Sequence, residues 1–510
     1  MTSTTEVVEC DLLVIGGGIN GAGIARDAAG RGLKVVLCEK DDLASHTSSA
    51  SSKLIHGGLR YLEYYEFGLV RKALQEREVL MRLAPQLISP LRFVMPHRPG
   101  LRPRWLLRAG LFLYDFIAAR ALLPSSRAID FASHASGAAL KKSFRHGFVY
   151  SDAWVDDARL VVLNALDAHE RGARIFTHTA CTGLTAQDEH WLAQLQATTA
   201  HGLSMTLKAR AVVNATGSWA ADFQHTYSPS LPQKNLRLVQ GSHIVVQRLF
   251  EHNHAYIFQH PDGRIVFAIP YEQEYTLIGT TDLEFQGDPN QIGISAQEVA
   301  YLCELSNQYF EKQIQAQDVV WSYSGVRPLV DDGHSDAKAI TRDYRFEMDV
   351  QNAPILHVFG GKITTYRRLA VEAMNKLAPT LGITSEDWTA HAVLPGGDLF
   401  FPTADNRNVV NFAKFVDACR QSYPFLSESL LMRYVRLYGA RIHQLLKACD
   451  SVSAMGEEIL PGLFDIEVQY LCRFEFAKVA QDILWRRTKL GLHLPKNAEA
   501  ILDAWLERIP

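Results

Sequence analysis

Three glycines near the start of the chain have the spacing of a phosphate-binding turn. Gly16, Gly18 and Gly21 follow an apolar run that ends at Ile15, and a helical pattern begins after them. Glycine lets the backbone approach phosphate oxygens, and the first turn of a helix offers free N–H groups at the positive end of its dipole. This stretch therefore predicts a strand, a tight turn and a helix that together hold a pyrophosphate.

A carboxylate follows the next predicted strand. Ala25, Ala29 and Gly32 give the predicted helix a small face that can lie close to a sheet, and residues 35–38 are typical of a buried strand. Glu39 ends that strand. A carboxylate at the end of the strand that follows the glycine turn and its helix can accept hydrogen bonds from a ribose 2′-hydroxyl. The pattern favours a nucleotide with an unphosphorylated adenosine end.

Residues 47–63 form a second candidate stretch, rich in serine, threonine and glycine. They directly follow the second predicted strand, where an extended dinucleotide would continue outward. Hydroxyl and backbone donors in this stretch could bind phosphate and ribose. A solvated serine-rich loop is the alternative interpretation.

Two later strand-and-turn patterns extend the candidate site. Residues 211–215 are apolar and end at Thr216 and Gly217, as expected for a later strand of the same sheet. Residues 355–359 lead into Gly360 and Gly361. Backbone N–H groups and a helix dipole at this last turn could stabilise the negative charge of a reduced flavin.

The elements between these turns predict how the chain is divided. Short β-branched or aromatic segments between residues 242 and 279 indicate an antiparallel sheet inserted after the nucleotide-binding strands. Beyond residue 397 the pattern is helical. We predict an α/β protein with a Rossmann-like nucleotide-binding domain at 1–70, 145–225 and 320–390, a helical segment that is a candidate for membrane contact at 71–144, the antiparallel sheet at 226–319 and a C-terminal helical domain at 391–510.

Composition narrows the classes of function. With 510 residues, 47% of them hydrophobic and 21% charged, the chain is globular and long enough for two or three domains. A net charge of −3 implies that any site for an anion is local. The seven cysteines are scattered, without a C-x-x-C pair. We therefore expect a reducing compartment and no metal centre.

The sequence also limits membrane and nucleic-acid partners. We expect no signal peptide and no membrane span, because neither a basic-then-apolar N-terminus nor an uncharged stretch of spanning length occurs. No nucleic-acid-binding motif is present, so we expect no such partner. Between Arg98 and Leu113, arginines interleave with Trp105 and leucines. This is typical of a helix in a membrane interface, but a buried helix with solvated arginines gives the same pattern.

Stretches along nearly the whole chain resemble the bacterial aerobic glycerol-3-phosphate dehydrogenases. They are the glycine frame at 16–32, S-S-K-L-I-H-G-G-L-R-Y-L at 51–62, W-V-D-D-A-R-L at 154–160, G-S-H-I-V at 241–245, I-G-T-T-D at 278–282, Y-S-G-V-R-P at 323–328, F-G-G-K-I-T-T-Y at 359–366 and W-R-R-T-K at 485–489. The resemblance implies FAD as the cofactor. It also implies a fold like that of glycine and D-amino-acid oxidases, in which the inserted antiparallel sheet binds substrate, with an added C-terminal helical domain.

The same resemblance implies a reaction and a location. The enzyme would oxidise sn-glycerol 3-phosphate to dihydroxyacetone phosphate and pass the electrons to ubiquinone. It would lie as a homodimer on the cytoplasmic face of the inner membrane, attached peripherally. The hydrogen on C2 would leave as a hydride toward flavin N5 while a base removes the hydroxyl proton.

Functional residues carry over to the positions that match the family's motifs. The resemblance implies FAD contacts at Gly16, Gly18, Asn20, Gly21, Glu39, Ser48, Ser52, Leu54, His56, Thr216, Gly217, Gly361 and Thr364. It implies a substrate and catalytic set of Arg60, Tyr61, His243, Arg327, Arg342 and Lys362. Arginine's planar fork suits a phosphate dianion. His243 is the expected base because of its reference pKa, and Lys362 or Arg327 would polarise the developing ketone oxygen.

Other interpretations stay open at this point. An oxidase of the same family would give its electrons to oxygen, and the flavin-site motifs do not separate it from a dehydrogenase. A non-catalytic FAD-binding protein would serve a partner as a redox module. An NAD-dependent dehydrogenase fits less well, because the later strand and glycine turns match flavoproteins. His243 could also be a histidine satisfied within a sheet, and Arg327 could simply cap a turn.

Overall fold

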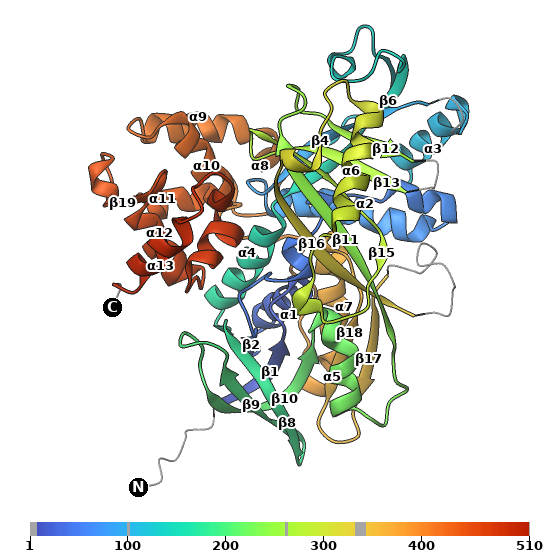
Figure 1. The fold of residues 1–510 in the computed structure, drawn as a ribbon. Helices are drawn as coiled ribbons and strands as arrows, with labels where there is room; N and C mark the ends of the chain where they lie inside the picture. Colours follow the sequence, from blue (N-terminus) through green and yellow to red (C-terminus); the bar gives the residue numbers. More distant parts are fainter. Residues whose placement is uncertain (1–7, 99–101, 261–263, 332–342, 509–510) are drawn as a thin grey trace.

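The computed structural model describes residues 8–98, 102–260, 264–331 and 343–508. Figure 1 shows a sheet with helices packed on it, a second sheet beside it and a group of helices at the C-terminal end. The predicted substrate residue Arg342 lies outside the described residues. No helix in the described part of the chain is both long enough and apolar enough to cross a membrane.

The first sheet contains the glycine turn. Its strands are β1 (Val8–Ile15), β2 (Val35–Cys38), β7 (Arg174–Phe176), β8 (Thr179–Gln187), β9 (His190–Ala197), β10 (Met205–Asn214), β17 (Arg345–Asp349) and β18 (Ile355–Phe359). The order β18-β10-β1-β2-β7 is parallel throughout, whereas β17 and the β8-β9 hairpin pair antiparallel. The predicted strands at 35–38, 211–215 and 355–359 are confirmed and lie in this sheet.

Helices cover one face of this sheet. They are α1 (Ile19–Gly30), α4 (Asp157–Glu170) and α7 (Tyr366–Leu381), while α5 (Ala220–Tyr227) lies near β10 and β18. Leu12 and Val14 of β1 face the α1, α4 and α7 cluster, whereas Leu13 and Ile15 face a second cluster that includes Trp191 of the β8-β9 hairpin. The central strand is therefore buried on both faces, as expected for a parallel sheet.

The second sheet is larger than the sequence predicted. Its strands are β3 (Leu54–Ile55), β4 (Ile88–Pro96), β5 (Arg127–Asp130), β6 (His146–Val155), β11 (Leu236–Gln247), β12 (Ala255–Gln259), β13 (Ile265–Tyr271), β14 (Tyr275–Gly279), β15 (Leu283–Glu284) and β16 (Val319–Val330). The backbone order is β15-β11-β14-β13-β12-β4-β6-β3, with β16 on β11 and β5 on β6. Only β11 to β15 fall wholly within the predicted insertion at 226–319.

The remaining strands correct the predicted segments. The segment 71–144 is not wholly helical, because it contains β4 and β5. β6 and most of β16, assigned by the sequence to the nucleotide-binding domain, pair in the second sheet. β4, β6 and β16 join the second sheet through partner strands that are far away in the sequence, as when β4 pairs with β12. Local patterns do not reveal such pairings.

Helices pack on both faces of the second sheet. α2 (Phe67–Leu83) and α3 (Arg104–Phe116) contribute Leu74 and Leu111 to the core on one face. α6 (Ala296–Tyr309) contributes Leu302 to the core on the other face. Ser295 caps α6 in a reciprocal pair with Glu298, a capping box that fixes the start of the helix.

The C-terminal region is a separate group of helices with its own core (Figure 1). Its elements are α8 (Asn406–Val410), α9 (Phe412–Ser422), α10 (Glu428–Tyr438), α11 (Ile442–Leu445), β19 (Glu458–Leu460), β20 (Leu463–Phe464), α12 (Asp465–Phe474), a π-helix (Asp482–Arg487) and α13 (Ala498–Leu506). The helical pattern predicted beyond residue 397 is confirmed, apart from the short β19-β20 pair.

Buried ion pairs attach this region to the nucleotide-binding sheet. Arg487 Nη2 lies 2.8 Å from Asp42 Oδ1, and Arg486 Nε lies 2.5 Å from Asp42 Oδ2. Arg159 of α4 pairs with Glu475, and both side chains are fully buried. Asp42 lies three residues after Glu39, in the loop that follows the second strand. The C-terminal domain therefore holds the loop that carries the predicted ribose carboxylate.

Replacing Arg487 by methionine should destabilise the protein by about 3–5 kcal/mol, because Asp42 would stay buried with one of its cations missing. Urea unfolding of the purified variant measures this loss. Arg420→Met is the matched control, since Arg420 forms its ion pairs with Asp417 and Glu428 at the surface and should change little. An Arg487→Met protein as stable as the wild type would contradict the assigned role of the pair.

Candidate active site

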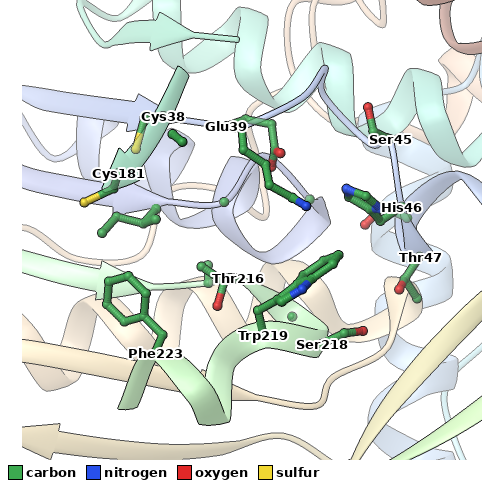
Figure 2. Close-up of a pocket in the computed structure, with 18 of the residues that line it drawn as sticks. Cys38, Glu39, Ser45, His46, Thr47, Cys181, Thr216, Ser218, Trp219 and Phe223 are labelled. Carbon is green, nitrogen blue, oxygen red and sulfur yellow. The ribbon is translucent and has the colours of Figure 1, made fainter. Parts of the chain in front are cut away.

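One cavity lies at the carboxyl ends of β1, β2 and β10, with a volume of about 210 Å³. Its lining includes six of the predicted FAD contacts, namely Gly16, Gly18, Glu39, Ser48, Thr216 and Gly217. Figure 2 shows Glu39 and His46 on one side of it and Thr216 and Trp219 on the other. Residues far apart in the sequence thus meet at the edge of the sheet where α/β proteins bind nucleotides.

The glycines allow a backbone approach that other residues would prevent. Gly16 has a φ of +112°, and a Cβ on it would lie 2.5 Å from the carbonyl oxygen of Ala215. A Cβ on Gly21 would lie 1.9 Å from the carbonyl oxygen of Gly16. α1 starts with no acidic residue in its first turn and no side-chain cap from Gly18. The helix start is therefore suited to an anionic group.

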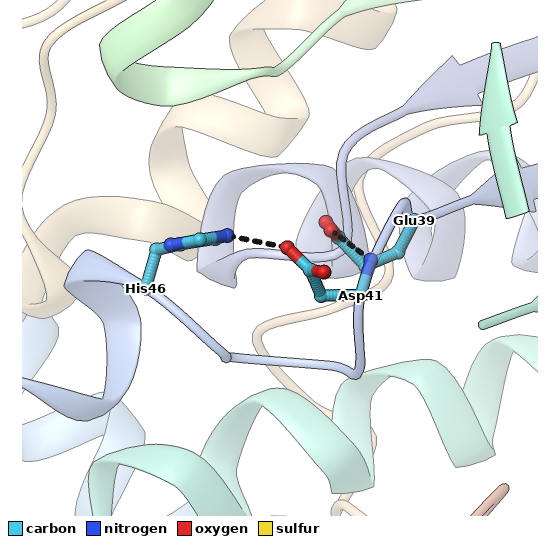
Figure 3. A group of neighbouring side chains, drawn as sticks. All are labelled: Glu39, Asp41 and His46. Atoms are coloured by element: carbon cyan, nitrogen blue, oxygen red, sulfur yellow. Dashed lines mark hydrogen bonds and ion pairs between the residues drawn. The ribbon is translucent and has the colours of Figure 1, made fainter. Parts of the chain in front are cut away.

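Glu39 is held at the cavity by backbone donors (Figure 3). Its two carboxylate oxygens accept hydrogen bonds from the N–H of Gly17 at 2.6 Å and of Asp41 at 3.0 Å. Burial raises the pKa of the Glu39 carboxyl, and these two hydrogen bonds oppose the rise. The remaining lone pairs of a carboxylate are free to accept ribose hydroxyls.

His46 and Asp41 stabilise the turn beside Glu39. His46 Nε2 lies 2.8 Å from Asp41 Oδ2, and this hydrogen bond lowers the pKa of the Asp41 carboxyl. Potential ligand atoms of Glu39, Asp41 and His46 lie within 4.8 Å of one another. The hydrogen bonds within the turn account for this arrangement without a metal ion.

The sequence analysis missed an aromatic wall of the cavity. Trp219 lies in the turn after β10, with Lys40 Nζ 4.1 Å from its ring centroid and the His46 ring at 4.8 Å. A tryptophan two residues after Gly217 was the available signal. Its flat face beside Glu39 offers a surface on which an adenine ring can pack.

A second group of predicted contacts leads away from this cavity. Asn20 Nδ2 donates to the carbonyl of Gly360 at 3.1 Å, which joins the start of α1 to the turn after β18. Within the described residues, Asn20 Oδ1 is buried without a hydrogen-bond partner, so a ligand hydroxyl could satisfy it. The N–H of His56 donates to Thr364 Oγ1 at 3.3 Å. These residues continue the path of an extended dinucleotide.

Leu54 differs from the other predicted cofactor residues. Its side chain is buried in the apolar core under the second sheet. Its backbone pairs with Trp154 of β6. The structure therefore assigns the Leu54 side chain to packing, and the neighbouring Ser52 and His56 carry the polar groups of this stretch.

His243 lies in the middle of β11, between β14 and β16. Its ring stacks on Tyr323 at 4.8 Å, and its Nε2 lies 2.9 Å from Ser52 Oγ. The residue is only 2% exposed. Burial lowers the pKa of the imidazole well below its ordinary value, and the charges of Arg327 and Lys53 act in the same direction. Burial therefore favours the neutral imidazole, which is the form that a general base needs.

The predicted cations approach this region from two sides. Arg327 of β16 pairs with Asp282 and donates from Nη2 to Thr280 Oγ1 at 2.9 Å. Lys362 Nζ lies 3.7 Å from the ring centroid of Tyr61. Arg60 is half-buried and donates to Tyr64 at 3.1 Å. His56 packs against Phe267, a β13 residue in register with Gly279 opposite His243. The residues around His56 and Lys362 and the residues around His243 and Arg327 thus border one region.

Comparisons with known proteins agree with this geometry. Residues 11–367 match the model of the family "FAD dependent oxidoreductase", and residues 388–509 match the "C-terminal domain of alpha-glycerophosphate oxidase". The chain belongs to the FAD-dependent oxidoreductase family. FAD is thus the cofactor, and the predicted class of enzyme is confirmed. The cavity, the glycine turn and the open acceptor of Asn20 are the features that fit this cofactor.

Relatives cover nearly the full length of this flavoenzyme. A glycerol-3-phosphate dehydrogenase of Pseudomonas aeruginosa is 49% identical over 98% of this chain and 95% of the relative. The aerobic glycerol-3-phosphate dehydrogenase of Escherichia coli is 46% identical over 97% of each chain. A D-erythritol 1-phosphate dehydrogenase of Brucella abortus is also 46% identical, over 98% of each chain.

Solved structures confirm the predicted fold. The FAD complex of the Bacillus halodurans glycerol-3-phosphate dehydrogenase has a TM-score of 0.75 at 24% identity, covering 98% of this chain and 94% of that one. Glycine oxidase of Geobacillus kaustophilus has a TM-score of 0.55 at 18% identity, over 75% of this chain and 100% of that one. The flavoenzyme therefore has the predicted oxidase-like fold with an additional C-terminal region.

Replacing Gly18 by alanine should weaken FAD binding by about tenfold or more, the loss of about one hydrogen bond to a charged group. The added Cβ would lie 3.1 Å from Ser48 Oγ, which accepts from the N–H of Ile19 at the start of α1. The ratio of bound flavin to protein after dialysis measures the effect. Gly68→Ala in α2 meets no atom within 4 Å and serves as the control. Full flavin content in Gly18→Ala would argue against this cradle.

Proposed function

We propose that this flavoenzyme oxidises sn-glycerol 3-phosphate to dihydroxyacetone phosphate and passes the electrons to ubiquinone. The observation that carries the proposal is the grouping of a neutral, buried His243 with the cations Arg327 and Lys362 beside the FAD-binding turns. The names of the relatives from Pseudomonas aeruginosa and Escherichia coli support the same substrate.

The side chains divide the work of the reaction. FAD, when bound, accepts the hydride that leaves C2 of the substrate. His243 accepts the hydroxyl proton, and Ser52 Oγ, 2.9 Å from Nε2, is the polar group that connects the buried imidazole to the site. Arg327 is oriented by Asp282 and Thr280. Its planar guanidinium can bind two oxygens of the substrate phosphate, and Lys362 offers a second positive charge.

D-erythritol 1-phosphate is a second candidate substrate. The Brucella abortus relative named for this substrate is as similar to the chain as the Escherichia coli relative. Both substrates are polyol phosphates with a secondary alcohol that can be oxidised to a ketone. The same base and the same phosphate-binding cations would serve either of them.

We propose a peripheral membrane location, on the cytoplasmic face of the inner membrane, from the surface of α3. This helix exposes Trp105 (71% exposed), Phe112 (56%) and Phe116 (64%), together with two arginines at positions 104 and 108. Exposed aromatics with cations beside them suit a membrane interface. A cavity of about 470 Å³ lies between α3 and the turn that carries Arg60, which supports transfer to a lipid-soluble quinone. The homodimer implied by the resemblance stays a prediction.

Anaerobic mixing of the holoenzyme with glycerol 3-phosphate should bleach the visible flavin bands, and a ubiquinone analogue should restore them. D-erythritol 1-phosphate tested in parallel identifies the preferred substrate by its larger kcat/KM. Restoration by oxygen at least as fast as by quinone would support the oxidase alternative. Bands that respond to neither phosphate would contradict the proposed reaction and favour a non-catalytic redox module.

Replacing Trp105 and Phe112 by serine should lower binding to anionic phospholipid vesicles by about tenfold to a hundredfold, because two exposed aromatic side chains would no longer enter the membrane interface. Co-sedimentation measures the bound fraction. Val410→Ser on α8 removes an equally exposed apolar side chain (73% exposed) and should leave binding unchanged. Equal loss in both variants would contradict α3 as the membrane contact.

A further inference from the structure

The hydroxyl-rich stretch at 47–53 is fixed by contacts on its outer side. Thr47 Oγ1 donates to the carbonyl of Val326 at 2.7 Å, and Tyr323 OH donates to the carbonyl of Ser51 at 2.8 Å. Ser52 Oγ is thereby free to face the imidazole of His243. The stretch at 47–53 is therefore held in a defined conformation, and it is not a solvated loop.

A buried ion pair holds the same stretch from below. Lys53 Nζ lies 2.8 Å from Asp157 Oδ1, and the two side chains are 1% and 0% exposed. Asp157 Oδ2 accepts from Ser51 Oγ at 2.7 Å and from the Ser51 N–H at 3.2 Å. Lys53 Nζ also donates to the carbonyl of Ser49 at 3.0 Å. The pair therefore ties the backbone on both sides of Ser52, at Ser49, Ser51 and Lys53, to the start of α4.

The conformation of Lys53 adds to the cost of this arrangement. Its φ is +58°, a left-handed conformation that is unfavourable for a residue with a Cβ. Burying an ion pair also requires desolvation of both charges, which a pair of apolar residues would avoid. Such a costly arrangement beside a proposed catalytic base points to a role beyond stability.

The charges near His243 come from the 47–53 stretch, α4, β16 and the turn after β14. Lys53 Nζ lies 5.0 Å from the centroid of the Tyr323 ring, and that ring also stacks on His243 at 4.8 Å. Lys53, Tyr323 and His243 therefore contact one another in sequence, with Asp157 behind the lysine. On the remaining side, Arg327 and its partner Asp282 approach from β16 and the turn after β14. Gly279 and Ser52 contribute no charge.

We propose that Lys53 and Asp157 are positioning residues for the oxidation: they hold Ser52 against His243 and set the local charge around the imidazole. This inference rests on the proposed function, in which His243 is the base. Lys53 alone would repel the imidazolium strongly, and Asp157 alone would attract it. The buried pair therefore gives an electrostatic potential at the ring that lies between the potentials of Lys53 alone and Asp157 alone.

Single substitutions of the pair should shift the pH dependence in opposite directions. Lys53→Met removes a positive charge and should raise the pKa of His243. The fall of the flavin reduction rate at low pH, the acid limb, should therefore move up by about one pH unit. Asp157→Asn leaves Lys53 uncompensated and should move the limb down. Anaerobic stopped-flow with glycerol 3-phosphate gives the limb. A pH titration of the visible flavin spectrum without substrate gives the same midpoint in the resting holoenzyme.

Three further variants make the test decisive. Lys447→Met removes an exposed lysine of the C-terminal domain and should leave the limb in place. The double variant Lys53→Met/Asp157→Asn, which has no buried charge to destabilise it, should keep the limb near its wild-type position but lower the plateau rate about tenfold, because Ser52 loses its support. His243→Ala should remove the limb altogether.

The outcomes separate this inference from the proposed function. Limbs that move the same way in both single variants, or not at all, would overturn the positioning role, as would a double variant with the wild-type plateau rate. An acid limb that persists in His243→Ala would instead refute His243 as the base. If the single variants do not retain FAD, the double variant decides the question through its plateau rate.

Discussion

The close approach of the first helix to the edge of the parallel sheet is the constraint on which the site depends. Gly16 and Gly21 bring backbone against backbone, and Gly16 also contacts the carbonyl of Ala215. Because β2, β10 and β18 run parallel to β1, their carboxyl ends reach the same edge. Ser48, Glu39 and Thr216 then surround the start of α1. The strand register thus fixes the cofactor site before any side chain contributes specificity.

The sequence predicted the parts of this site that depend on local chemistry. The spacing of Gly16, Gly18 and Gly21 and the position of Glu39 follow from a strand, a turn and a helix. The aromatic wall at Trp219 and the interdomain contact of Asp42 could not be read in the same way, since their partners are far away in the sequence. The same reason explains why β4 and β6 were assigned to the wrong segments.

Asp156 and Asp157 show most clearly what could not be predicted from the sequence alone. Asp156 caps α4 by accepting from the N–H of Arg159. Asp157, one residue later, points into the protein and pairs with Lys53. Adjacent residues of the same type thus have different roles, and only the three-dimensional position of Lys53 distinguishes them. The supporting contact between Lys53 and Asp157 was not among the site residues carried over from the family.

The buried ion pairs between the two family regions have an evolutionary consequence. The two matched regions end and begin near residues 367 and 388, which suggests modules that could be inherited separately. Yet Asp42 and Arg159 lie in the first module, and their partners Arg487 and Glu475 lie in the second. Recombination that exchanged one module alone between distant relatives would leave buried charges without their partners in both halves. These residues are therefore expected to be inherited as matched pairs, and the boundary is a poor point for domain shuffling.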